Sequence, residues 1–65
     1  MTRQIELVPA FTLQPGDTLL IRDGELCTFQ RSVIGNEGML LRIYRQDQAQ
    51  WALVQHDAVV ARVVQ

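Results

Sequence analysis

The 65-residue chain is short of the residue types that hold many small domains together. Cys27 is the only cysteine, so no disulfide can form within the chain, and His56 is the only histidine, so cysteine and histidine side chains cannot assemble a zinc site. We therefore expect no metal and no cofactor. A single core of this size contributes only about 3–5 kcal/mol of net stability, and small domains often add self-association to it.

Lysine and long apolar runs are also missing. All six basic residues are arginines and the formal net charge is −1, which argues against both a strongly basic nucleic-acid binder and an acidic mimic of DNA. The first residues lack the apolar region of a signal peptide, and no run approaches the roughly 18 apolar residues of a membrane span. The sequence predicts a soluble, cytoplasmic protein that forms one domain over residues 1–65.

Short runs of strand-forming residues, separated by turn residues, predict an all-β fold. We expect an N-terminal arm over residues 1–13, a turn at 14–17, and a short 3₁₀ turn at 56–58. The five expected strands cover residues 17–22, 25–34, 39–45, 51–55 and 59–64. Helix is the alternative for the C-terminal tail, because a short apolar run cannot be assigned by its period alone, but the Val-Val pairs favour a strand.

The stretch FTLQPGDTLLIRDGELCTF…GMLLRIYRQDQAQWALVQHDAVVARV resembles the SH3-like small β-barrel superfamily. The likeness lies in the strand lengths and in the order of three hairpins, a 3₁₀ turn and a closing strand. It implies a five-stranded SH3-like barrel. The plasmid-borne type II dihydrofolate reductases look similar, as small barrels that assemble into a ring. Where their Val-Gln-Ile-Tyr pore motif should fall, this chain has Trp51-Ala52-Leu53-Val54, so their activity is not carried over.

The Asp23-Gly24 pair predicts which side chains face the core. These residues favour a two-residue type I′ turn, which places Leu20 opposite Cys27 and Leu19 opposite Thr28. We expect the ladder to continue through the turn at 35–38. Because successive side chains alternate between the two faces, this register defines one aliphatic face as the core. The expected core residues are Leu19, Ile21, Leu26, Ile34, Met39, Leu41 and Ile43.

The opposite face is too apolar for an ordinary solvated face of an antiparallel sheet. Its expected members are Thr18, Leu20, Arg22, Glu25, Cys27, Phe29, Arg31, Val33, Leu40, Arg42 and Tyr44. Apolar and aromatic residues with arginine are typical of interfaces. The predicted pairing of Arg31 with Arg42 is repulsive, which indicates either an acidic partner between the two guanidiniums or a β-bulge. A bulge near Gln30 is the alternative, and it would turn Val33 inward.

The face on which Trp51 lies depends on the length of the turn within residues 46–50. A two-residue turn would place Trp51 on the open face opposite Tyr44, and a three-residue turn would place it on the core side. Since QDQAQ contains no glycine for a type I′ turn, we expect Trp51 to be mostly buried at the end of the barrel. Cys27 is expected to pack as a small apolar side chain, and Asp57 to cap the 3₁₀ turn beside His56. No pair of carboxylates is spaced for acid–base chemistry, so we predict no catalytic residues and no enzyme.

Two functions follow from the open face. The first is a non-enzymatic protein-binding module that docks a partner or a second copy, as would suit an accessory or inhibitory protein of a bacterium or mobile element. Its predicted contact residues are Leu20, Phe29, Arg31, Leu40, Arg42 and Tyr44.

The alternative is nucleic-acid binding, in which arginines grip phosphates while Phe29 and Tyr44 stack on bases. The predicted phosphate-binding residues are Arg22, Arg31, Arg42 and Arg45. The salt dependence of binding should distinguish the two functions, since the affinity for nucleic acid falls steeply with salt and the affinity of an apolar protein interface does not. Neither a membrane nor a small-molecule substrate is expected.

Overall fold

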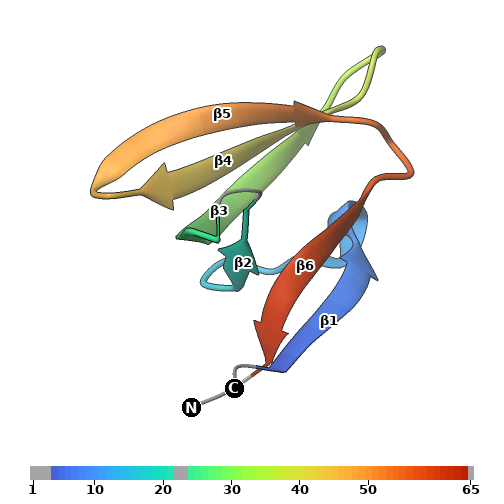
Figure 1. Cartoon of the computed structure of the whole chain (residues 1–65). Coiled ribbons are helices and arrows are strands. Elements are labelled where there is room, and N and C mark those ends of the chain that lie inside the picture. The colour runs from blue at the N-terminus through green and yellow to red at the C-terminus, as the bar shows by residue number, and fades with distance from the viewer. Residues whose placement is uncertain (1–3, 22–23, 65) are drawn as a thin grey trace.

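The computed structural model of the protein describes residues 4–21 and 24–64. Its elements are β1 (Gln4–Pro9), the 3₁₀ helix η1 (Ala10–Thr12), β2 (Thr18–Leu20), β3 (Leu26–Ile34), β4 (Met39–Arg45), β5 (Gln48–Val54) and β6 (Val59–Val64). The strands form one antiparallel sheet in the order β1-β6-β2-β3-β4-β5. Figure 1 shows β3, β4 and β5 in one part of this sheet and β1 and β6 in the other.

The all-β prediction is confirmed, and the strand over residues 59–64 is confirmed against the helical alternative. The prediction of a five-stranded closed barrel is wrong, because the sheet has six strands and does not close. The sheet ends at β1 on one side and at β5 on the other, and no described strand pairs with the outer side of either. β1 and β5 are therefore the two edge strands of the described sheet.

The predicted N-terminal arm is a strand. β1 pairs with β6 along its whole length, from Gln4 opposite Val64 to Pro9 opposite Val59. Proline is tolerated here because β1 is an edge strand, where one side needs no backbone donor. The only 3₁₀ helix in the described part of the chain is η1, directly after β1. At 56–58, where a short 3₁₀ turn was predicted, the chain makes a single turn closed by a 3₁₀-type hydrogen bond from the N–H of Ala58 to the carbonyl of Gln55.

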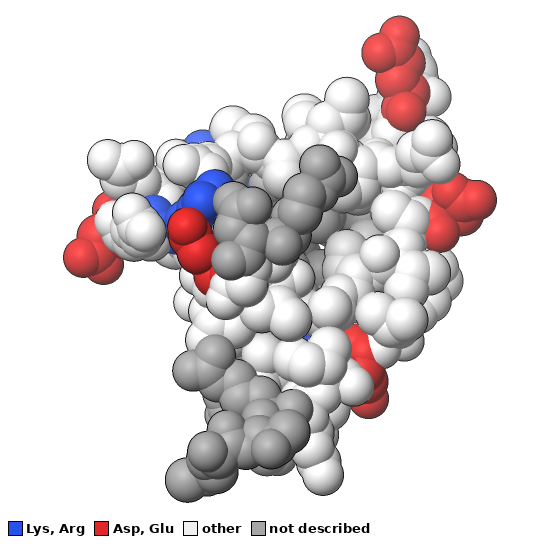
Figure 2. Space-filling model, viewed as in Figure 1, with Lys and Arg blue, Asp and Glu red and all other residues white. Residues whose placement is uncertain are grey.

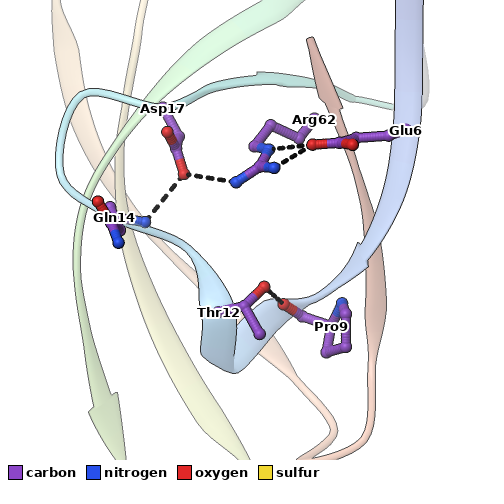
Figure 3. Close-up of polar contacts among 6 residues, drawn as sticks. All are labelled: Glu6, Pro9, Thr12, Gln14, Asp17 and Arg62. Atoms are coloured by element: carbon purple, nitrogen blue, oxygen red, sulfur yellow. Dashed lines mark hydrogen bonds and ion pairs between the residues drawn. The ribbon is translucent and has the colours of Figure 1, made fainter. Parts of the chain in front are cut away.

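Arg62 of β6 joins three parts of the fold (Figure 3). Its guanidinium donates from both Nε and Nη2 to Oε1 of Glu6 on β1, and the Nε–Oε1 distance is 2.7 Å. Its Nη1 lies 3.6 Å from Oδ2 of Asp17, and the same carboxylate oxygen accepts a hydrogen bond from the backbone of Gln14. One arginine thus ties the N-terminal strand and the turn before β2 to the C-terminal strand.

The first hairpin is one residue out of the predicted register. Leu19 lies opposite Cys27, and Leu20 lies opposite Leu26. The backbone of Ile21 donates to Glu25, and Gly24 donates back to Ile21, so three residues separate the strand partners Ile21 and Glu25 instead of two. Gly24 adopts a φ of 78°, as the last residue of a three-residue hairpin loop commonly does. Asp23 of the predicted turn lies outside the described residues.

The shifted register reverses the two faces in the first half of β3. Cys27 and Phe29 point into the core, so the prediction that they lie on the open face is wrong. A bulge between Phe29 and Arg31 then reverses the faces again, and its position matches the predicted alternative at Gln30. Because the two one-residue shifts cancel, Arg31 returns to the outer face. Its pairing with Arg42, which the turn at 35–38 sets, is as predicted. Val33 remains exposed and is not turned inward.

The core lies on the inner face of the bent sheet. Its buried residues are Ala10, Leu13, Leu19, Cys27, Phe29, Met39, Leu41 and Ile43. Of the other predicted core residues, Ile21 packs against this cluster and Leu26 is half-buried. The prediction is wrong for Ile34, which is 74% exposed. Ile34 is the last residue of β3, and its strand partner Met39 is buried in its place.

An ion pair between Arg45 and Glu25 makes one contribution to stability dependent on pH. Nε of Arg45 lies 2.6 Å from Oε2 of Glu25, and this hydrogen bond lowers the pKa of Glu25 from its ordinary value of 4.5. Because the pKa of Glu25 is lower in the folded state, the ion pair contributes fully to folding stability above pH 4.5. This contribution is lost as the pH falls through the pKa that Glu25 has in the folded protein. The effect is small because both side chains are partly solvated.

We expect Glu25→Gln to reduce the loss of stability on acidification below pH 4.5. Urea unfolding midpoints measured across the acidic range would test this, with Glu37→Gln in an exposed turn as the control. Identical pH profiles for wild type and Glu25→Gln would contradict the assignment.

Candidate binding face

The outer face of β3, β4 and β5 carries nine side chains in three cross-strand rows, which we call the Arg–Trp face. The strand pairing defines each row. The rows are Val33–Leu40–Leu53, Arg31–Arg42–Trp51 and Thr28–Tyr44–Ala49. The central row holds both charges and the largest aromatic side chain, and the first row is aliphatic.

A tight turn between β4 and β5 places Trp51 in the central row. Gln46 and Asp47 both have positive φ, at 52° and 63°, and Arg45 pairs with Gln48 directly across them. This is the geometry of a two-residue type I′ turn, formed without glycine. The expectation that QDQAQ, which lacks glycine, would avoid this turn is therefore wrong, and Trp51 lies opposite Arg42 instead of Tyr44.

Trp51 is not buried at the end of a barrel, as the sequence had suggested. Its side chain is 44% exposed, and two guanidinium groups lie over its ring. Cζ of Arg42 is 5.0 Å from the ring centroid and Cζ of Arg31 is 5.3 Å from it. A cation–π contact at an exposed site is worth about 0.5–1 kcal/mol. The indole ring therefore offsets part of the repulsion between the two paired arginines.

Neither Arg31 nor Arg42 forms an ion pair with a described carboxylate, in contrast to the arginines elsewhere in the described structure. Arg45 pairs with Glu25, and Arg62 pairs with Glu6 and Asp17. On the side shown in Figure 2, the acidic side chains occupy separate positions with uncharged surface between them. The Arg–Trp face thus keeps two positive charges that the described part of the chain does not neutralise.

The rest of the face is apolar and accessible. Leu53 is 64% exposed and Tyr44 is 43% exposed, and Val33 and Leu40 are exposed to a similar degree as Tyr44. Isolated apolar side chains are common on protein surfaces, but contiguous rows of them mark interaction sites. The aliphatic row borders the arginine and tryptophan row directly, so one partner can contact both.

Four of the six predicted contact residues come together on the Arg–Trp face: Arg31, Leu40, Arg42 and Tyr44. Phe29 is buried, and Leu20 lies on β2, between β6 and β3. The sequence prediction missed Leu53 and left Trp51 in the core. Their positions depend on the length of the turn between β4 and β5, for which the sequence carries no glycine signal.

The residues predicted to bind nucleic acid do not gather on one face. Arg31 and Arg42 are adjacent, but Arg45 alternates onto the other side of β4 and is paired with Glu25. Arg22 lies outside the described residues. Of the three described arginines in the predicted set, two are neighbours on one face.

The described His, Cys, Asp and Glu side chains lie in separate parts of the fold or in ion pairs. Within residues 4–21 and 24–64, no group of three His, Cys, Asp or Glu side chains could hold a metal ion. His56 forms a hydrogen bond of 2.8 Å between Nε2 and the carbonyl of Gly35, which connects the turns after β3 and β5. No helix in the described part of the chain has the length and apolar character needed to cross a membrane.

Cys27 is expected to react with thiol reagents only when the protein unfolds. Its side chain is buried, and burial raises the pKa of the thiol, so the reactive thiolate is scarce in the folded state. Labelling with an aromatic disulfide reagent should be slow in buffer and fast in urea. Rapid stoichiometric labelling of the folded protein would contradict the core position of Cys27.

No protein family model, curated protein or solved structure matches this chain. The resemblance to SH3-like barrels therefore remains a prediction from the strand pattern.

Proposed function

We propose that this protein is a non-enzymatic binding module that docks a protein partner through the Arg–Trp face. The observation that carries the proposal is the half-exposed indole of Trp51, which lies under the guanidiniums of Arg31 and Arg42 beside an exposed aliphatic row. Tryptophan, tyrosine and arginine are the residues most enriched among those that dominate binding energy in protein interfaces.

The arrangement also limits the entropy lost on binding. Arginine side chains are flexible, and ordering them at an interface costs free energy. Here both guanidiniums already rest on the ring of Trp51, so part of that ordering is present before a partner arrives. The aliphatic row of Val33, Leu40 and Leu53 adds apolar area that becomes buried on contact.

Nucleic-acid binding is the weaker candidate. A groove that follows a phosphate backbone needs several cations along one path. The Arg–Trp face offers only Arg31 and Arg42, Arg45 is engaged on the other side of the sheet, and the formal net charge of the chain is −1.

A selection from displayed random peptides would test the proposal, with Trp51→Ala as the test variant. Its matched control is Leu7→Ala, which also removes an exposed apolar side chain but on β1, outside the Arg–Trp face. We expect selected peptides to bind Trp51→Ala about 30-fold more weakly and Leu7→Ala unchanged, as for the loss of an interface hot spot.

Two results would contradict the proposal. One is that no selected peptide depends on Trp51. The other is that single-stranded oligonucleotides bind the face with an affinity that falls steeply with salt, which would favour the nucleic-acid function. Light scattering at micromolar concentration would show whether the docked partner is a second copy.

A further inference from the structure

The two edges of the sheet differ in how they resist pairing with another strand. Edge strands in natural proteins are commonly protected by charged residues or proline. β1 carries both, with Glu6 in an ion pair to Arg62 and Pro9 at its end. β5, with the sequence QAQWALV, has seven residues and neither a charge nor a proline. β5 is therefore the unprotected edge (Figure 1).

The turn before β5 determines which backbone groups point to this open edge. In a type I′ turn the residues on either side, Arg45 and Gln48, face each other with their backbone groups directed inward. Such pairs alternate along an antiparallel ladder with pairs directed outward. The N–H and C=O groups of Ala49, Trp51 and Leu53 are therefore directed away from β4 and are free to pair with an added strand.

The same edge carries the unneutralised positive charge of the Arg–Trp face. Arg42 belongs to β4, but its guanidinium lies over Trp51 of the edge strand. An added strand would lie about 4.8 Å from β5, and its alternate side chains would join the Arg–Trp face beside Trp51 and Leu53. A carboxylate beside Trp51 would come within reach of Arg42, and a residue two positions away would meet Leu53.

We infer that β5 accepts an extended acidic segment of a protein partner as an added strand. The segment places an Asp or Glu beside Trp51 and an aliphatic residue two positions away beside Leu53. This inference rests on the proposed function and names the chemistry of the partner. A second copy of β5 does not supply the carboxylate, because QAQWALV contains none.

Three synthetic peptide pools would test the inference. They differ only at one central position, which is Glu, Gln or Arg, and their remaining positions carry Val, Ile or Thr. Titration of the ¹⁵N-labelled protein should show shifts and slowed exchange for the amides of Ala49, Trp51 and Leu53. The Glu pool should bind about tenfold more tightly than the Gln pool, the margin expected when a neutral hydrogen bond becomes charge-assisted.

Variants at matched positions identify the source of this preference. Arg42→Gln should remove the difference between the Glu and Gln pools, whereas Arg45→Gln, on the same strand but the opposite face, should retain it. Ala49→Pro removes an outward N–H and should weaken binding of both pools. The unchanged amide spectrum of β1 and β6 would show that each variant is folded.

The inference is overturned if the Glu and Gln pools bind equally, or if peptides bind without slowing amide exchange in β5. It is also overturned if β5 amides are already protected in a dimer of the free protein. In the first two cases, peptides that still depend on Trp51 would leave the proposed binding function intact. A complete lack of Trp51-dependent binding, in contrast, would reject the proposed function itself.

Discussion

Phe29→Ala is expected to unfold the protein at room temperature. Phe29 is 2% exposed and is the largest fully buried side chain in the described core. Replacing a buried phenylalanine by alanine costs about 3–5 kcal/mol, because the lost apolar contacts leave a cavity. A single core in a chain of this size supplies about the same net stability. The substitution therefore removes most or all of the stability available.

Tyr44→Ala is the matched control for this prediction. Tyr44 is also aromatic and lies on the neighbouring strand, but the residue is 43% exposed. Far-ultraviolet circular dichroism and urea titration should show a folded Tyr44→Ala variant and an unfolded Phe29→Ala variant. If Phe29→Ala unfolds at the same urea concentration as the wild type, Phe29 does not occupy the core. The register predicted from Asp23-Gly24 implied that loss of Phe29 leaves the fold intact, so the experiment also decides between the two registers.

Gly38→Ala is expected to destabilise the protein by about 1–3 kcal/mol, the usual cost of forcing extra volume into a packed site. A Cβ at Gly38 would lie 2.3 Å from the carbonyl oxygen of Val54. The obstacle is backbone and cannot rotate aside, so β4 and β5 must separate where Met39 pairs with Val54. Met39 is a buried core residue, so the separation would also disturb the packing of the core.

Gly35→Ala provides the control within the same turn. A Cβ at Gly35 would meet only the carbonyl oxygen of Gly38, at an ordinary contact distance of 3.5 Å. Urea midpoints should therefore fall clearly for Gly38→Ala and change little for Gly35→Ala. Equal midpoints for the two variants would show that the backbone of Val54 does not approach Gly38 this closely.

Local patterns predicted part of the Arg–Trp face correctly. The turn at 35–38 set the pairing of Arg31 with Arg42 and of Val33 with Leu40, because a short turn between two strands leaves little choice of register. Runs of strand-forming residues between turn residues predicted the bounds of β4 and β6 as the structure has them. These features depend on residues that are near one another in the chain.

The incorrect predictions fall at two turns, each of which has two conformations of similar energy. Gly24 permits a two-residue or a three-residue loop, and the choice decides whether Phe29 faces solvent or the core. Gln46 and Asp47 adopt positive φ without the help of glycine, and this turn brings Trp51 onto the open face. In both hairpins, burial of side chains on the inner face outweighs the small conformational preference of the turn.

Local sequence patterns were enough to predict an all-β chain, the positions of most strands, and an outer face that carries arginines and apolar side chains. Contacts between distant parts of the chain set the remaining features: residues 4–9 form a strand, the sheet stays open at β5, and the guanidiniums of Arg31 and Arg42 lie over the ring of Trp51. Pairings such as Glu6 with Arg62 join residues from opposite ends of the chain. Their free energy depends on which surfaces the folded sheet buries, and no local pattern records that.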